Sequence, residues 1–234
     1  MDFLHENAKI GNLVAKVPEY ANLFETLGLD YCCQGNKTLL ELCNEKNLDV
    51  VEILQRLKQI STTDSSVDWD AMSIEEIVKY IVDKYHVYAR QEIPRINQLL
   101  DKLNTKHGKR YAYIAELQTV FEKMKDDLLE HMEEEETVVF PLIIRLSIDE
   151  KCTPGEINNH FGSLEEDHLE TGAALEKIKQ LTNDYTPPSD ACMTHIVMLD
   201  SLKRLEKNLH EHIHKENHIL FPRSTKMNRQ DVNT

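Results

Sequence analysis

The sequence predicts an all-α protein, an up-down four-helix bundle preceded by a small helical domain. The first observation is that the 234 residues contain only 7 glycines and 7 prolines, which leaves few turns and favours long helices. The second is the capping box, a Ser or Thr followed three residues later by Glu, which marks helix starts at Thr38, Ser73 and Thr153. The third is an apolar repeat of about 3.6 residues along four long segments.

Residues 1–62 are expected to form the small helical domain. The capping box of Thr38 and Glu41 begins a helix, and Cys32 and Cys33 lie in the loop before it. Because thiols near a helix N-terminus can have a lowered pKa, we expect a larger thiolate fraction for this pair. Neighbouring Cα atoms, about 3.8 Å apart, are too close for an ordinary disulfide, and packing in a tight turn is the alternative. The other cysteines are expected to be packing residues: Cys43, Cys152 and Cys192.

The rest of the chain is expected to form the bundle. A polar tract at 61–66 marks the boundary. The linker is placed at 63–72, the bundle at 73–222 and a tail at 223–234. Short connections between long helices favour antiparallel neighbours. The four helices are predicted at 73–104, 112–139, 154–182 and 190–220.

The composition argues against several classes of function. The chain has 27 Lys and Arg against 41 Asp and Glu, a net charge of -14 that would repel nucleic acid and anionic membrane surfaces. The longest apolar run, at 138–144, is too short to cross a bilayer, and no secretory signal is visible at the start of the chain. Five cysteines without framework spacing indicate a reducing compartment, so we expect a cytoplasmic protein.

A set of residues that can bind metal recurs with a fixed offset. His86 in the first helix and His168 in the third are 82 residues apart. The two helix pairs therefore resemble copies of one hairpin, with these side chains related by an approximate two-fold axis inside the bundle. The residues repeated after 81 positions are His131, Glu135, Phe140 and Pro141, which recur as His212, Glu216, Phe221 and Pro222.

Helical phase places the histidine and glutamate of the fourth helix toward the core. At about 100° per residue, His212 and Glu216 share the face of Leu209. His168 falls inside the apolar face of the third helix, and His160 lies on the same face two turns away. The remaining histidines of the fourth helix are expected on the solvent face: His210, His214 and His218.

The second helix shows the same pattern, whereas the first is equivocal. The apolar stripe of the second helix continues through His131 and Glu135 to Val138. His86 lies at the edge of the first helix's stripe, about 80° from its centre. Two neighbouring acids flank the second stripe and are interpreted as a solvated charge run: Glu134 and Glu136.

These side chains predict a metal centre. A single His and Glu four residues apart is usually a surface pair, and a single inward His is usually a hydrogen-bonded core residue. Burying two carboxylates and four imidazoles together is severely unfavourable unless cations compensate them. The donor set suits iron, whereas zinc would prefer closed sites with cysteine. We expect two iron ions per chain with an oxo or hydroxo bridge and bridging carboxylates, which leaves about one open position on each iron.

The ordered motifs resemble one family over nearly the whole chain. The motifs that carry the resemblance are DYCCQG at 30–35, KYH at 84–86, HMEEE at 131–135, EDH at 166–168, TPP at 186–188 and HIHKEN at 212–217. In this order they resemble the RIC family, the di-iron, hemerythrin-like proteins of the YtfE/ScdA type, which are associated with the repair of iron-sulfur clusters.

The resemblance implies both the ligands and the activity. The family's iron ligands fall on His86, His131, Glu135, His168, His212 and Glu216, with Glu135 and Glu216 bridging. The implied function is the repair of clusters damaged by nitrosative or oxidative stress, through iron donation or nitric oxide reduction, the latter being a redox enzyme activity. Implied partners are damaged iron-sulfur proteins and nitric oxide, and a homodimer is left open. Asp127 and Asp167 stand where the family often has glutamate, and with Cys32 and Cys33 they are the candidate catalytic residues.

Other functions remain to be weighed against repair. A hemerythrin-like carrier or sensor of oxygen or nitric oxide is the main alternative, although such carriers have one more histidine ligand. Ferritin-like storage sites are richer in glutamate and are built on Glu-x-x-His. The last alternative is an interaction bundle without metal, which an iron assay would test.

Overall fold

The computed structural model describes residues 3–60, 67–148 and 155–227. Within these ranges the secondary structure is helical, without a strand, which confirms the predicted all-α class. The chain divides into two compact units, Val78–Leu209 and a second unit formed by Met1–Ile77 together with His210–Thr234. The domain boundaries at 63–72 and 223 stay predictions, because parts of the linker and the tail lie outside the described residues.

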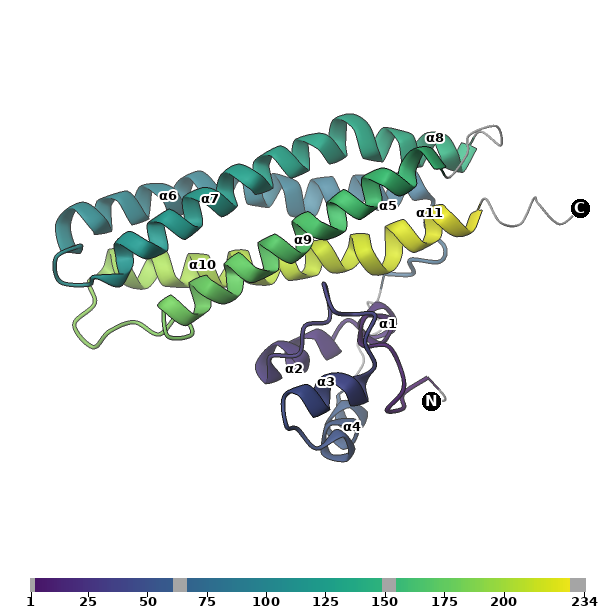
Figure 1. Ribbon diagram of the computed structural model, residues 1–234, viewed down its shortest axis with the longest axis horizontal. Coiled ribbons are helices and arrows are strands. Elements are labelled where there is room, and N and C mark those ends of the chain that lie inside the picture. The colour runs from purple at the N-terminus through teal and green to yellow at the C-terminus, as the bar shows by residue number, and fades with distance from the viewer. Residues whose placement is uncertain (1–2, 61–66, 149–154, 228–234) are drawn as a thin grey trace, which may run out of the picture. The chain divides into compact units, whose positions relative to one another are not determined.

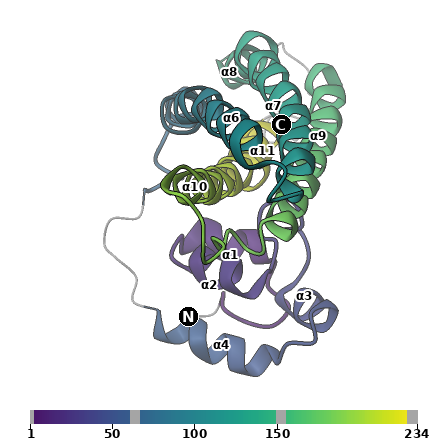
Figure 2. The same ribbon diagram turned by 90° about the vertical axis from the view of Figure 1, so that its left-hand side faces the viewer.

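The unit Val78–Leu209 contains the four-helix bundle. Its long helices run along one another in Figure 1 and are seen nearly end-on in Figure 2. They are α6 (Val87–His107), α7 (Tyr113–Glu134), α9 (Gly155–Leu181) and α10 (Met193–Lys215), the last contributing its residues up to Leu209. None of the described helices combines the length and apolar character that a membrane crossing requires.

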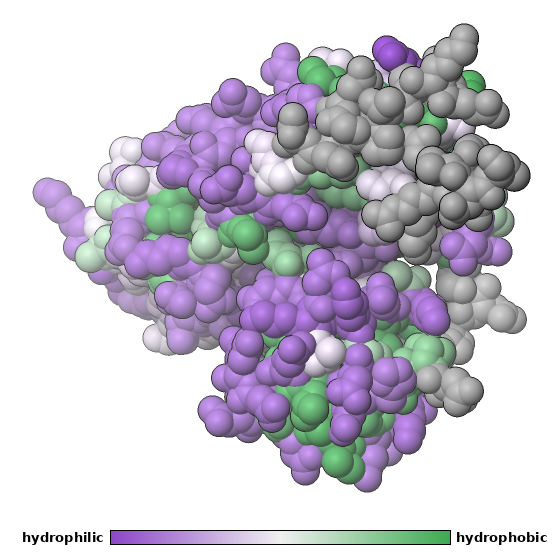
Figure 3. Space-filling view, turned by 45° about the vertical axis from the view of Figure 1, so that its right-hand side comes forward, coloured by the Kyte–Doolittle hydropathy of each residue, from purple (hydrophilic) through white to green (hydrophobic). Residues whose placement is uncertain are grey.

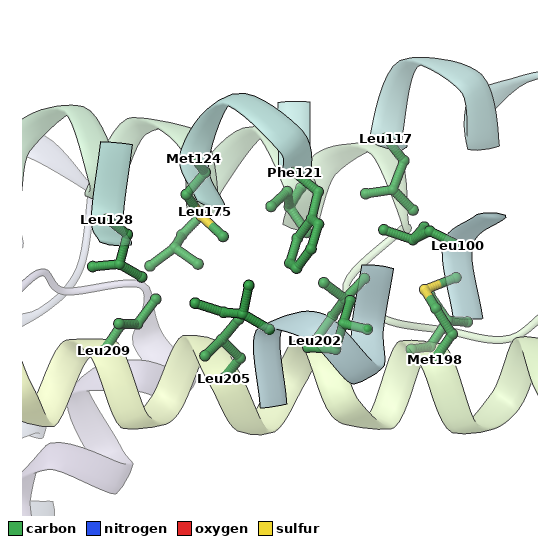
Figure 4. Packing of buried hydrophobic residues seen from close by; sticks show 14 of the residues in the cluster. Leu100, Leu117, Phe121, Met124, Leu128, Leu175, Met198, Leu202, Leu205 and Leu209 are labelled. Atoms are coloured by element: carbon green, nitrogen blue, oxygen red, sulfur yellow. The ribbon is translucent and has the colours of Figure 1, made fainter. Parts of the chain in front are cut away.

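The core of the bundle follows the predicted apolar stripes. Figure 4 shows side chains from facing helices meeting along the bundle. Each buried aliphatic side chain of this kind contributes roughly 1.5–3 kcal/mol relative to an exposed one. The apolar residues that recur along these four segments and are buried include Ile96, Leu103, Leu117, Phe121, Met124, Leu128, Leu164, Leu175, Ile178, Leu202, Leu205 and Leu209.

In the described part of the chain, three π-helical turns lie at predicted ligands, in the first, second and fourth long helical segments, whereas α9, which carries His168, has none. They are η1 (Val82–His86), η2 (Glu135–Val139) and η3 (Glu216–Leu220). The turn η1 joins α5 (Ile74–Ile81) to α6, η2 joins α7 to α8 (Phe140–Ile148), and η3 joins α10 to α11 (Phe221–Met227). π-turns inside α-helices are frequently found at functional sites. The 81-residue repeat is thus a repeat of local structure, since η2 and η3 occupy equivalent positions.

The second and fourth helical segments are longer than predicted. They continue to Ile148 and Met227, beyond the predicted ends at 139 and 220 and past Pro141 and Pro222. Each proline is the second residue after a π-turn. In a π-turn the backbone hydrogen bonds join residues five apart instead of four. The missing N–H of proline is therefore accommodated there without breaking the helix.

The described part of the unit formed by Met1–Ile77 and His210–Thr234 contains four short helices near the N-terminus. The predicted capping box is present, because the Thr38 side chain accepts from the Glu41 N–H and the Glu41 carboxylate accepts from the Thr38 N–H. The box of Ser73 and Glu76 is also formed, whereas that of Thr153 lies outside the described residues. The four helices are α1 (Ile10–Lys16), α2 (Tyr20–Leu27), α3 (Leu39–Glu45) and α4 (Val50–Gln59).

The surface seen in Figure 3 is mainly hydrophilic, with apolar residues scattered among charged ones. Large exposed apolar side chains such as Ile148, Leu169 and Met193 belong to different helices of the described chain. Single apolar residues of this kind are normal on a soluble surface. They do not by themselves indicate a docking site.

A buried histidine lies near the start of α10, well before the predicted ligands of that helix. His195 is fully buried, its Nε2 pairs with the Tyr113 hydroxyl, and its ring lies edge-on to Tyr111, with centroids 4.9 Å apart. Burial, together with the nearby charge of His107, lowers the pKa of His195. The same desolvation raises the pKa of Tyr113 to about 12.

The His195 pKa predicts a loss of stability in mild acid. The folded state binds a proton at His195 less readily than the unfolded state does. The contribution of neutral His195 to the unfolding free energy is therefore complete above pH about 6.5 and decreases as the pH falls below it. The difference in unfolding free energy between wild type and His195→Gln, measured in denaturant, should therefore shrink from pH 7.5 to pH 5.5. A difference that grows on acidification would contradict the assignment.

Candidate metal centre

His86 is held by carboxylates on both ring nitrogens. It is the last residue of η1 and is fully buried. Its Nδ1 lies 2.7 Å from Oε1 of Glu136, and its Nε2 lies 3.4 Å from Oε2 of Glu135. Glu136 also accepts from the Arg90 guanidinium. Burial raises the pKa of Glu136, but the bonds from His86 and Arg90 outweigh this effect and lower the pKa overall.

Glu135 lies between two histidines. It is the first residue of η2, is fully buried, and places Oε1 3.4 Å from Nε2 of His131 while Oε2 faces His86. A carboxylate with one oxygen toward each of two imidazoles has the orientation that a bridging ligand requires. The helical offset of four residues explains why His131 and Glu135 share one face.

His131 and His168 present ring nitrogens to each other. Their Nε2 atoms are 3.2 Å apart, and the Nδ1 of His131 lies 3.0 Å from Oδ2 of Asp167. A proton on Nδ1 of His131, donated to Asp167, leaves the lone pair of Nε2 pointing inward. Carboxylates on the outer nitrogen commonly orient metal-binding histidines in this way.

The other predicted ligands lie in the second unit. His212 and Glu216 are buried, and Nε2 of His212 lies 2.7 Å from Oε1 of Glu216. Glu216 is the first residue of η3, as Glu135 is of η2. The pair thus reproduces, at the predicted offset, the local arrangement of His131 and Glu135.

The spacing of these atoms fits a bound cation. Two ligands that each lie about 2.1 Å from one ion are roughly 3 Å apart. The ligand atoms of His131, Glu135 and His168 lie within 4.8 Å of one another, with individual separations of 3.2 and 3.4 Å. Without a cation, facing imidazole nitrogens and a buried carboxylate would be costly. Imidazole and carboxylate donors suit iron.

Asp127 and Asp167 differ in their relation to the centre. Asp167 contacts His131, whereas Asp127 is half-exposed and pairs with Lys123 at 2.7 Å. Both aspartates line a cleft of about 480 Å³ between α7 and α9, which also reaches His131. Their role in catalysis stays a prediction.

Several sequence expectations about exposure are wrong. Cys192, which was expected to be a packing residue, is exposed. Glu136, assigned to a solvated charge run, binds His86. His214 is fully buried, with Nε2 2.9 Å from the Gly11 carbonyl, and His218 Nε2 donates to the Cys32 carbonyl at 3.0 Å. Both histidines were expected on the solvent face. Helical phase alone placed these two histidines on a helix face that points away from the core of the bundle. It did not reveal that N-terminal residues of the same unit cover that face.

The two cysteines occupy the predicted loop, but the expected pKa shift is wrong for one of them. Cys32 is buried and Cys33 is half-buried, before the start of α3 at Leu39. The hydrogen bond with Cys33, burial, and the nearby Asp30 carboxylate raise the pKa of the Cys32 thiol. The neutral thiol is therefore favoured, because these local groups outweigh any effect of the short helix.

Asp167 should strengthen iron binding by orienting His131. In Asp167→Asn the charge that supports the Nδ1 proton is lost, so we expect iron affinity to fall by about 10- to 100-fold. Competition with a chelator monitored by absorbance measures this change. Asp127→Asn, on the same cleft but paired with Lys123, is the matched control. Equal losses in the two variants would contradict the positioning role.

A helical bundle that buries facing imidazole nitrogens around a glutamate defines a hemerythrin-type metal-binding protein. The family model described as Hemerythrin HHE cation binding domain matches residues 78–224, and the chain belongs to this family. A second model, described as a domain of unknown function (DUF542), matches residues 6–61.

Curated relatives cover almost the whole chain. Iron-sulfur cluster repair protein ScdA of Staphylococcus haemolyticus is 31% identical over 91% of this chain and 95% of its own length. Iron-sulfur cluster repair protein YtfE of Yersinia pseudotuberculosis is 31% identical, over 94% and 97% respectively. The resemblance to the YtfE/ScdA type is thereby confirmed.

Proposed function

We propose that the chain repairs iron-sulfur clusters damaged by nitrosative or oxidative stress, using two iron ions. The observation that carries the proposal is Glu135, whose two oxygens each face a different histidine. The names of the relatives support the activity. The proposed ligands are His86, His131, Glu135, His168, His212 and Glu216, with both glutamates bridging.

The protein groups have distinct roles in this proposal. Glu136 and Asp167 fix the outer nitrogens of His86 and His131, which keeps the inner Nε2 atoms unprotonated. The ring of His86 stacks on Phe140, with centroids 5.8 Å apart, which restricts water on that side. When bound, the iron pair supplies redox chemistry toward nitric oxide and iron for transfer to a damaged cluster. We place this activity in the cytoplasm, with damaged iron-sulfur proteins as partners.

The test compares repair with metal content. Anaerobically purified wild type should contain about two irons per chain and restore activity to a cluster enzyme inactivated by nitric oxide. His131→Ala should lose both properties, while His160→Ala, which removes a half-buried histidine paired with Glu134, should retain them. Repair by the metal-free His131→Ala protein would overturn the proposal.

The carrier alternative is not favoured. The relatives that span more than nine-tenths of the chain are named for cluster repair rather than for gas binding. Oxygen binding that stays reversible over many cycles, with no repair in the assay above, would instead support a carrier.

A further inference from the structure

The loop before α3 gathers three metal-ligating groups outside the His and Glu centre. The Sγ atoms of Cys32 and Cys33 lie 3.6 Å apart, and Cys32 Sγ lies 3.1 Å from Oδ1 of Asp30. Ligand atoms of all three lie within 4.8 Å of one another. Cys33 and Asp30 are only half-buried, so an ion can reach the cluster from the surface.

The spacing matches the ligands of one tetrahedral ion. Metal–sulfur bonds of about 2.3 Å at a tetrahedral angle place two sulfur ligands roughly 3.8 Å apart. The observed 3.6 Å requires little adjustment. A disulfide would need the sulfurs at about 2.05 Å, between residues whose Cα atoms are too close for ordinary geometry.

Backbone N–H groups of the loop bind the Asp30 carboxylate. Oδ1 of Asp30 accepts from the N–H groups of Cys32 at 3.1 Å and Cys33 at 2.9 Å. The carboxylate is therefore fixed beside both thiols before any ion binds. A preformed set of ligands loses less conformational entropy on binding than a mobile one.

The same loop is hydrogen-bonded to η3, which belongs to the same unit. The Cys32 carbonyl accepts from Nδ2 of Asn217 at 3.3 Å and from Nε2 of His218 at 3.0 Å. Asn217 directly follows Glu216, a proposed iron ligand. The rings of Tyr31 and His214 are also in T-shaped contact, with centroids 5.4 Å apart. The thiol pair is thus positioned by the turn that presents Glu216.

We propose that Asp30, Cys32 and Cys33 form a second metal site, which binds a thiophilic divalent cation through two thiolates and one carboxylate. The identity of the ion as Fe²⁺ rests on the proposed function, in which iron leaves or enters the His and Glu centre. Binding is a ligand exchange without oxidation or reduction. The aqua ion releases water ligands as two metal–sulfur bonds form, the two thiol protons pass to water, and the hydrogen bond from Cys32 to Asp30 is replaced by a metal–oxygen bond.

Cobalt titration of the full-length, iron-loaded protein tests the site. Co²⁺ bound by thiolates gives a strong charge-transfer band in the near ultraviolet, which histidine and carboxylate ligands do not give. We expect the band to saturate at one equivalent and to decrease when Fe²⁺ is added anaerobically in excess. Cys33→Ser should abolish it, and Cys192→Ser, an exposed cysteine outside the cluster, should leave it unchanged.

The variants separate this inference from the proposed function. Because Cys32 is buried, the half-buried Cys33 and Asp30 are the preferred positions for substitution. Circular dichroism checks that the variants Cys33→Ser and Asp30→Asn are folded. Absence of the band in folded wild type, or its persistence in folded Cys33→Ser, overturns the thiolate site and leaves the iron assay untouched. His131→Ala should lose iron yet keep the cobalt band, so failure of the His and Glu centre is seen independently.

Discussion

Replacing Glu135 with glutamine is expected to remove nearly all bound iron. The carboxylate is fully buried and directs one oxygen toward His86 and the other toward His131, at 3.4 Å each. In the proposed di-iron centre, glutamine would remove the negative charge and turn an NH₂ group toward one of the two cations. Because Glu135 is proposed to bridge them, its loss should exceed the 10- to 100-fold effect typical of an outer partner such as Asp167. Iron per chain and the absorbance of the purified protein measure the result.

Two comparisons make this result specific. Glu133→Gln changes an exposed acid two residues earlier on the same helix and should keep full iron content. Metal-free Glu135→Gln should unfold at no lower denaturant concentration than metal-free wild type, because the variant no longer buries an uncompensated charge. Wild-type iron occupancy in Glu135→Gln would contradict the ligand assignment, and a large drop in stability would indicate a packing role instead.

The apolar periodicity predicted the bundle, because burial of one stripe per helix determines how long helices pack. It failed locally at the π-turns. Val138 was predicted to continue the core stripe, but it is 39% exposed, while Val139 and Phe140 are buried. The turn η2 accommodates an extra residue, so side chains beyond it are displaced by about 100° from an uninterrupted helix.

The same displacement explains the equivocal position of His86. A count of 3.6 residues per turn placed it about 80° from the core stripe, yet it is fully buried at the end of η1. The family resemblance, rather than helical phase, indicated its role. No sequence signal for a π-turn is evident in these segments, although each turn contains or begins with a proposed ligand.

Tertiary contacts account for the other differences. The Glu136 carboxylate lies beside a run of acids, and only the approach of His86 and Arg90 distinguishes it from its neighbours. The burial of His214 likewise depends on Gly11, which is 203 residues away in the sequence. Local patterns do not encode such partners. The contact between a glycine and a histidine so distant in the sequence can be recognised only in the folded structure.

The second large effect is expected for Gly35→Ala, which should detach the cysteine loop from η3. A Cβ at Gly35 would collide with the Tyr31 carbonyl and with the His218 ring. The carbonyl belongs to the backbone and cannot move aside as a flexible side chain can. We expect a destabilisation of about 1–3 kcal/mol from overpacking, measured by denaturant unfolding, with faster hydrogen exchange in α1 and α3.

A matched alanine substitution controls for the loss of glycine itself. Gly162 is an exposed residue of α9, and a Cβ added there would have no neighbouring atom within 4 Å. Gly162→Ala should therefore stabilise the helix by about 0.5–1 kcal/mol. Gly35→Ala with wild-type stability would show that the loop is not packed tightly against His218.

Gly11→Ala extends the test to the same histidine. Its Cβ would lie 2.6 Å from the His218 ring, and its three nearest atoms all belong to that ring, so the ring can turn away at the cost of its bond to the Cys32 carbonyl. The single variant should therefore be less destabilised than Gly35→Ala. Because both substitutions displace one ring, the double variant should lose less stability than the sum of the two. If the losses of unfolding free energy in the two single variants add up to that of the double variant, the two glycines act through separate contacts. His218 would then not be the residue through which both substitutions affect the cysteine loop.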